Sequence, residues 1–177
     1  MILTRQRFWF LRHGETDWNA QGLSQGNIDI PLNATGIAQA HAAAPLLRAR
    51  GNASIVASPL SRAHDTAKVA AGLLDLPVHL DEGLRETSFG AQEGKPMTDW
   101  FADWVGGTYT PPDAEPFAAL RARAVAAVNR ALERPGMVLV VAHGALFRAL
   151  RAEMGLNPMS EPATPGPCCA NPTTPGR

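Results

Sequence analysis

The stretch Phe8-Trp9-Phe10-Leu11-Arg12-His13-Gly14-Glu15-Thr16 decides the fold, because a short apolar run ends there in an arginine, a histidine and a glycine. The run Phe8–Leu11 has the length and composition of a buried strand. A histidine at the carboxyl end of a parallel strand faces the crevice in which α/β proteins bind ligands. The stretch therefore predicts a functional site at one edge of a sheet.

The rest of the chain alternates between predicted strands and predicted helices. Further strands are expected at Ser54–Ala57, Pro77–Leu80 and Met137–Ala142. The last of these is apolar at every position, as a central parallel strand covered on both faces should be. Helices are expected at about 33–50, 60–74, 117–132 and 145–154. This alternation predicts an α/β fold, a three-layer α/β/α sandwich with a mostly parallel central sheet.

Apolar residues recur at helical spacing in the predicted helices. The first helix, which Asn33 or Thr35 would cap, carries Ile37, Ala40, Ala44 and Leu47 on one face, with Pro45 unfavourably placed inside it. The helix near residue 117 carries Phe117, Leu120, Ala124, Val128 and Leu132. Residues 82–116 lack such a pattern and are predicted to be irregular.

The length of 177 residues suits one buried core and is short for two domains. We expect one domain over residues 1–157 and a tail over residues 158–177, in which six of the twenty residues are proline. Such a tail is expected to be extended or mobile and to lack a further strand. A sheet shortened in this way would expose an edge through which an oligomer could form.

The 16 basic and 16 acidic residues give a formal net charge of zero. No overall field therefore attracts nucleic acid or a membrane surface, and no apolar run approaches the length of a membrane span. Cys168 and Cys169 are adjacent and do not form a disulfide framework. The apolar stretch at the N-terminus is too short for a signal peptide, so a cytoplasmic location is expected.

Polar side chains follow each predicted strand. Arg12 and His13 follow the first strand, Arg62 the second, Glu86 the third and His143 the fourth. Each of them alone is unremarkable, but in a parallel sheet they converge on the carboxyl edge. The resulting cluster is rich in cationic groups and suits a dianion.

A metal site is the main chemical alternative. His13, Glu86 and His143 could form a site of two histidines and one carboxylate. However, Arg12 and Arg62 would place fixed positive charges beside the cation. At about 4 Å such a repulsion costs on the order of 4 kcal/mol in a partly screened site. Neither a metal nor another cofactor is therefore expected.

Together these motifs resemble the histidine phosphatase superfamily, in its phosphoglycerate mutase-like branch. The resemblance is carried, in this order, by Leu11–Thr16, Asn19, Ser58–Ala63, Glu86 and His143-Gly144. It extends from about Phe8 to Met154, which is most of the chain, and implies a phosphoglycerate mutase-like fold.

The resemblance implies a role for each residue of the cluster. His13 would be the nucleophile and would form a phosphohistidine. Arg12, Arg62 and a protonated His143 would surround the transferring phosphoryl oxygens. Glu86 would protonate the leaving alkoxide and then accept a proton from water.

The resemblance also implies contacts with a small phosphorylated substrate. Asn19, Gln25, Gly26 and Gly144 match positions that touch substrate in the family. Glu15 is interpreted as a structural residue rather than as the proton donor. The aromatic segment from Trp100 to Tyr109 is expected to cover the pocket, to pack as a small aromatic core, or to do both.

Two departures from the mutase pattern favour hydrolysis. The interval from Glu86 to His143 spans 57 positions, which is short for a mutase, and contains no Arg-Arg pair. Ala145 stands where the mutases carry an amide side chain. The sequence therefore predicts a phosphomonoesterase. The alternatives are phosphoryl transfer of the mutase type and a non-catalytic or degenerate protein that binds phosphorylated ligands.

Overall fold

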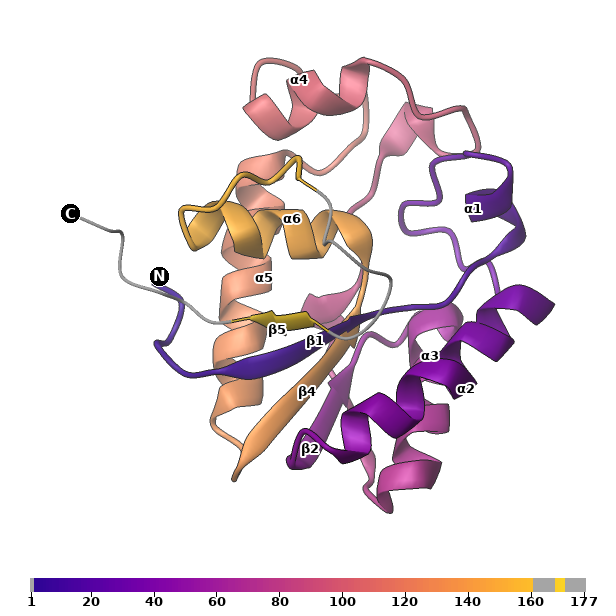
Figure 1. Cartoon of the computed structure of the whole chain (residues 1–177). Helices are drawn as coiled ribbons and strands as arrows, with labels where there is room; N and C mark the ends of the chain where they lie inside the picture. The colour runs from indigo at the N-terminus through magenta and orange to yellow at the C-terminus, as the bar shows by residue number, and fades with distance from the viewer. Residues whose placement is uncertain (1, 161–167, 171–177) are drawn as a thin grey trace.

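The structure of the protein is a computed structural model that describes residues 2–160 and 168–170 (Figure 1). Its sheet has the strand order β3-β2-β4-β1-β5. The strands are β1 (Phe8–Arg12), β2 (Asn52–Ala57), β3 (Val78–Leu80), β4 (Met137–Ala142) and β5 (Cys168–Ala170). Strands β1 to β4 are parallel and β5 runs antiparallel to β1. The predicted, mostly parallel sheet is confirmed.

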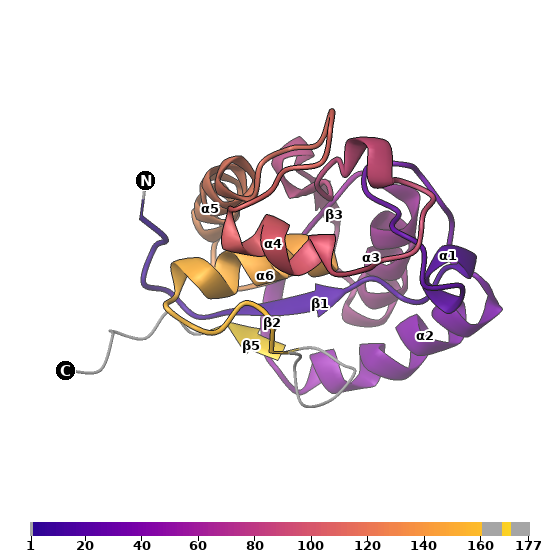
Figure 2. The same cartoon turned by 90° about the horizontal axis from the view of Figure 1, so that it is seen from above.

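Helices cover both faces of this sheet, so the predicted three layers are also confirmed (Figures 1 and 2). Helices α5 and α6 pack on one face and α2 and α3 on the other. The helices are α1 (Asp17–Ala20), α2 (Ala34–Arg48), α3 (Ser61–Leu74), α4 (Trp100–Gly106), α5 (Phe117–Leu132) and α6 (Gly144–Glu153). Two short 3₁₀ helices, η1 (Glu82–Leu84) and η2 (Gly90–Gln92), lie between β3 and α4.

The pleat of the strands divides the core into two clusters. Along β1, Phe8 and Phe10 pack on the α5–α6 side, whereas Leu11 faces α2 and α3. In β4 all residues from Val138 to Ala142 are fully buried. Strand β4 is thus the central strand that its apolar composition predicted, and the segment after it leads into the middle of the carboxyl edge.

Helix α2 begins at the predicted cap but buries a slightly different face. The side chain of Asn33 accepts a hydrogen bond from the N–H of Gly36. Ile37, which was expected to be buried, is 48% exposed, and Gly36 is buried instead. Pro45 lies on the exposed face, where water can replace the hydrogen bond that proline removes from the helix.

Part of the stretch predicted to be irregular is helical. Helix α4 lies beyond the carboxyl ends of the strands (Figure 1). Its Trp104 is fully buried, stacks edge-on against Phe89 and Phe117, and donates a hydrogen bond of 2.9 Å to the carbonyl of Glu115. Seven residues are too few for a helical period to stand out in the sequence, which explains why this helix was missed.

The expectation that the tail contributes no strand is wrong for three residues. Cys168–Ala170 pairs with Phe8–Phe10 as an edge strand. A strand this short, at an edge, tolerates the prolines on either side because only one of its sides needs donors. The predicted mobility of the tail concerns residues 161–167 and 171–177, which lie outside the described residues.

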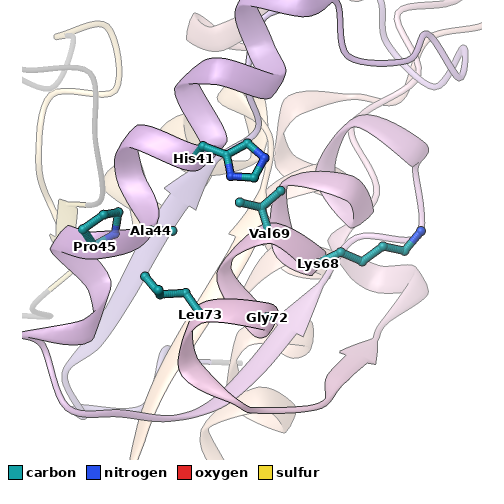
Figure 3. A pocket seen from close by; sticks show the side chains of 7 residues that line it. All are labelled: His41, Ala44, Pro45, Lys68, Val69, Gly72 and Leu73. Carbon is teal, nitrogen blue, oxygen red and sulfur yellow. The ribbon is translucent and has the colours of Figure 1, made fainter.

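A hollow of about 410 Å³ lies between α2 and α3 (Figure 3). Its lining includes His41, Lys68 and Leu73 and none of the polar residues that follow the strands. Within the described part of the chain, no helix has both the length and the apolar character needed to cross a membrane.

Candidate active site

The residues that were predicted to form a site lie together at the carboxyl edge of the sheet. A cavity of about 290 Å³ is lined by eight of the nine: Arg12, His13, Asn19, Gln25, Gly26, Arg62, Glu86 and Gly144. The ninth, His143, is fully buried, and its ring centroid lies 5.2 Å from that of His13. The remaining lining residues are Leu23, Phe89, Met97, Phe101, Ala145, Arg148 and Met159.

The ring of His13 is oriented by the backbone carbonyl of the next residue, Gly14. The backbone N–H of His13 donates to the carbonyl of Ala142 at the end of β4, at 3.0 Å. Its Nδ1 lies 2.7 Å from the carbonyl oxygen of Gly14. Because a carbonyl can only accept, Nδ1 carries the proton and Nε2 keeps its lone pair. Burial, followed by the charges of Arg12 and Arg62, lowers the pKa of His13 well below its ordinary value. The ring is therefore neutral and suited to nucleophilic attack.

His143 caps the N-terminus of α6 and is held by Ser58. Its Nε2 lies 2.7 Å from Oγ of Ser58, which also accepts the N–H of Leu60 at 3.3 Å. Its Nδ1 is buried and has no hydrogen-bond partner among the described residues. Burial lowers the pKa of His143 well below its ordinary value, and His13 adds to this effect. A bound anion would act in the opposite direction, because a negative neighbour favours the charged imidazolium.

Arg62 is 1% exposed and fixes the loop after α1. Its guanidinium donates to the carbonyls of Gly26 and Ile28, each at 2.8 Å, while its Nε is buried without a partner in the described part of the chain. Burial lowers the pKa of Arg62, but an arginine stays charged in a protein. Gly26 has φ of +55°, and a Cβ there would lie 2.1 Å from Oε1 of Glu93. The positive φ and this close contact both favour glycine at the turn.

Arg12 is exposed and forms the rim of the cavity. Its Nε would lie 3.5 Å from a Cβ built on Gly144. The start of α6 therefore lies beside the side chain of Arg12 at the end of β1.

Glu86 lies beneath the first turn of α6. Its carboxylate, 7% exposed as a residue, accepts the N–H groups of Ala145 at 3.0 Å and Leu146 at 3.2 Å. Burial raises the pKa of Glu86, although these bonds and the charge of Arg62 oppose the shift. A buried carboxyl with a raised pKa keeps its proton to higher pH than an exposed one, which suits a proton donor.

Arg123 of α5 holds the backbone that precedes Glu86. It donates to the carbonyls of Gly83 at 2.9 Å and Arg85 at 2.8 Å, and it pairs with Glu115 at 2.6 Å. The sequence analysis missed this residue, because an arginine on a helix is ordinary until its partners are known.

Thr16 organises the two amide side chains of the cavity. Its hydroxyl is shared between Oε1 of Gln25 at 2.7 Å and Oδ1 of Asn19 at 3.2 Å. Because both amide oxygens are engaged, the amide N–H groups are the ends that can donate to an anion in the cavity.

Glu15 faces away from the chemistry. Its Oε1 accepts a hydrogen bond of 3.0 Å from Asn33, the cap of α2. The same loop touches α2 directly, since a Cβ on Gly14 would lie 2.3 Å from the carbonyl oxygen of Gly36. The structural interpretation of Glu15 fits this geometry, and Gly36 is a contact that sequence reasoning missed.

The sequence analysis also gave no role to three other residues in or beside the cavity. Ser58 was inside a quoted motif without a role, and Arg148 follows Gly144 by one helical turn, which could have signalled a shared face. Met159 reaches the cavity only because the chain turns back after α6, and no local pattern indicates that. Among the described residues, no three histidine, cysteine, aspartate or glutamate side chains are grouped so that they could hold a metal ion.

Comparison with known proteins adds the family to this geometry. Residues 8–169 match the histidine phosphatase superfamily (branch 1). The chain belongs to this superfamily. The phosphatase is 39% identical over 147 residues to the uncharacterized phosphatase PhoE of Bacillus subtilis (strain 168), covering 81% of this chain and 75% of that protein.

Two further relatives are a probable phosphoglycerate mutase and a phosphatase of known structure. The chain is 38% identical over 165 residues to the probable phosphoglycerate mutase GpmB of Yersinia enterocolitica, with 86% of this chain and 77% of that protein covered. Among solved structures, a mycobacterial glucosyl-3-phosphoglycerate phosphatase is similar with a TM-score of 0.72 and 35% identity, covering 84% of this chain and 80% of that one. The predicted phosphoglycerate mutase-like fold and histidine-type phosphatase are confirmed.

Proposed function

We propose that this phosphatase hydrolyses a small phosphate monoester through a phosphohistidine on Nε2 of His13. The observation that carries the proposal is the hydrogen bond between Nδ1 of His13 and the carbonyl of Gly14, at 2.7 Å. It fixes the tautomer with a free lone pair on Nε2, in a cavity that Arg12 and Arg62 also line.

In the first step the phosphoryl group is bound by Arg12, Arg62 and His143. Nε2 of His13 forms a bond to phosphorus as the ester P–O bond breaks. The carboxyl of Glu86 gives its proton to the departing oxygen, which leaves as an alcohol. The cationic groups stabilise the negative charge on the phosphoryl oxygens throughout the step.

In the second step water attacks the phosphorus of the phosphohistidine. The carboxylate of Glu86 takes a proton from this water as the P–N bond breaks. His13 returns to its neutral form and inorganic phosphate is released. No atom of this scheme requires a metal ion.

Phosphoryl transfer to a second substrate group is the other candidate, favoured by the relative named as a probable phosphoglycerate mutase. The first turn of α6 argues against it. Ala145 has no polar side chain, and its N–H already donates to Glu86 at 3.0 Å. This position therefore offers no donor to an acceptor group of the substrate, which supports hydrolysis.

The test is hydrolysis of an aryl phosphate in the presence of EDTA, with trapping of an acid-labile phosphoenzyme. His13→Ala is expected to lower turnover by at least about a thousandfold. His41→Ala, a change in the hollow between α2 and α3, is the matched control and should leave turnover unchanged.

Three results would count against the proposal in different ways. Wild-type turnover in His13→Ala would refute the phosphohistidine. Conversion of phosphoglycerate into its isomer without release of phosphate would indicate transfer. A rise in melting temperature with vanadate but no turnover of any ester would indicate a binding protein.

A further inference from the structure

Thr66 of α3 is a buried polar residue that the proposed chemistry does not use. It is 2% exposed and lies one helical turn after Arg62. Its hydroxyl donates a hydrogen bond to the carbonyl of Arg62 at 2.8 Å and accepts one from the N–H of Gly14 at 3.1 Å. The direction of both bonds is fixed by the partners, because a carbonyl can only accept and an N–H can only donate.

Only one of these two bonds is ordinary for a threonine in a helix. Threonines often donate to the carbonyl one turn earlier on the same helix. Gly14, by contrast, belongs to the loop after β1, 52 positions away in the sequence. Gly14 is itself buried, and a buried N–H that loses its acceptor is costly. The hydroxyl of Thr66 therefore determines where the peptide between His13 and Gly14 lies.

Gly14 is also the residue whose carbonyl orients the nucleophile. That carbonyl oxygen lies 2.7 Å from Nδ1 of His13 and belongs to the peptide between Gly14 and Glu15. The N–H of the same peptide donates to Oε1 of Gln39, on α2, at 2.8 Å. The two peptides on either side of Gly14 are thus each held by one side chain, that of Thr66 from α3 and that of Gln39 from α2.

These two side chains are not equivalent. Gln39 is exposed, so water can replace it as the acceptor. Thr66 is buried, and it also connects Gly14 to the first turn of α3, from which Arg62 extends to the cavity. One hydroxyl therefore links the backbone that orients the nucleophile to the backbone that carries a phosphate-binding arginine.

From this geometry we propose that Thr66 is a positioning residue for phosphoryl transfer: its hydroxyl holds Gly14 so that the Gly14 carbonyl keeps the ring proton of His13 on Nδ1. The lone pair of Nε2 then stays free for attack on phosphorus. The inference rests on the proposed phosphohistidine function and adds to it a residue that does not touch the substrate. Because the side chain of Arg62 keeps its own bonds to two backbone carbonyls, loss of the hydroxyl should impair attack more than phosphate binding.

The test replaces Thr66 by valine, which keeps the shape without the hydroxyl, and by serine, which keeps the hydroxyl. Thr66→Val should lower kcat for the aryl phosphate about 10- to 100-fold, as a displacement of about 1 Å in a reacting group does. Its affinity for sulfate should stay within about threefold of wild type, because an interaction that acts only in the transition state leaves ground-state binding unchanged. Thr66→Ser should keep kcat within about threefold, since its hydroxyl can make the same two bonds.

Nitrogen NMR of the histidine rings gives a second readout in the free enzyme. Wild type and Thr66→Ser should show His13 with its proton on Nδ1. Thr66→Val should show a measurable share of the form with the proton on Nε2, because the carbonyl that selects the first form is no longer held in place. If Thr66→Val does not fold, Thr66→Ala removes the same hydroxyl and is judged by the same measurements.

Leu74→Ala, at the other end of α3, is the matched control. Leu74 packs against the core cluster on the α2–α3 side of the sheet and does not line the cavity. Its truncation should lower the melting temperature, as Thr66→Val should, but leave kcat and the tautomer of His13 unchanged.

Three results would overturn the inference. The first is wild-type kcat and an unchanged tautomer in Thr66→Val. The second is an equal fall of kcat in Thr66→Val and in either Thr66→Ser or Leu74→Ala, since packing rather than the hydroxyl would then be responsible. The third is an equal loss of kcat and sulfate affinity in Thr66→Val, which would indicate a general loosening of the cavity.

Failure of the proposed function is a separate result. A wild-type protein that hydrolyses no ester, the aryl phosphate included, would refute the phosphatase. The tautomer of His13 in the free protein would still show whether Thr66 positions the ring.

Discussion

The contact between the loop after β1 and helix α2 leads to a quantitative prediction for Gly36→Ala. A Cβ at this position would lie 2.0 Å from the carbonyl oxygen of Glu15 and 2.7 Å from its N–H nitrogen. Both atoms are backbone, so the added methyl group cannot be accommodated by rotation of a side chain. Overpacking of this kind costs about 1–3 kcal/mol, which for a domain of this size lowers the melting temperature by about 2–4 °C per kcal/mol.

The displaced loop also carries His13, so the change should lower turnover. A shift of about 1 Å in a reacting group can cost on the order of a hundredfold in rate. We expect Gly36→Ala to lower kcat for the aryl phosphate by about tenfold or more, with thermal melting as the parallel measurement of stability.

Gly72→Ala in α3 is the matched control, since a Cβ there meets no atom within 4 Å. Removal of a glycine from a helix interior should raise stability by about 0.4–1 kcal/mol, with unchanged turnover. If Gly36→Ala melted and turned over like wild type, the close contact between α2 and the loop would not exist in solution.

Three other predictions concern the groups of the candidate phosphate site. Ser58→Ala should lower kcat by about tenfold and shift the pH profile of kcat, because Oγ of Ser58 lies 2.7 Å from Nε2 of His143 and orients its ring. A lower kcat with the wild-type pH profile would argue against this positioning role. The raised pKa of Glu86 means that its carboxyl keeps its proton to higher pH. Wild-type kcat/KM should therefore fall as pH rises through that pKa, because the proton donor is lost. This fall at alkaline pH should be absent from the pH profile of Glu86→Gln. The pKa values of His13 and His143 are lowered, so both rings are neutral near pH 7 when no anion is bound, and sulfate binding should be accompanied by proton uptake. Titration calorimetry in buffers of different ionisation enthalpy measures this uptake. Binding enthalpies that do not depend on the buffer would contradict the prediction.

The same shifts determine how stability depends on pH. In the unfolded chain a histidine takes a proton near pH 6.5, whereas His13 and His143 resist protonation in the folded protein. Their contribution to stability is thus complete above that pH and is lost as pH falls from there through the lowered pKa of the folded state. Glu86 acts in the opposite sense, because its raised pKa favours the folded state when the carboxyl is protonated.

The inner half of the site was predictable because strong signals determine it. The apolar run of β4 and the short run of β1 identify central parallel strands, and the residues that follow them meet at one edge by geometry alone. The positions of Arg12, His13 and His143 at this edge could therefore be predicted without knowledge of the loop conformations.

The outer half depends on features that a local pattern does not encode. Helix α4 is short, and its anchor Trp104 packs against Phe89, the residue before η2, and Phe117 of α5 rather than following a helical period of its own. Ile37 has helical spacing but is exposed, whereas its neighbour Gly36 is buried in close contact with the backbone of Glu15. Strand β5 forms only because β1 offers a free edge, so its three residues carry no strand signal.

This division of the cavity has a consequence for how such an enzyme can change over time. The groups that would break and make bonds to phosphorus follow the carboxyl ends of the strands, whereas Phe101 comes from α4, Arg148 from the second turn of α6 and Met159 from the segment after α6. Mutations at these three positions are expected to alter substrate preference without changing the strands. A laboratory library restricted to these three positions would sample new specificities while preserving the chemistry, and lineages that diverge here can share one reaction while acting on unrelated metabolites.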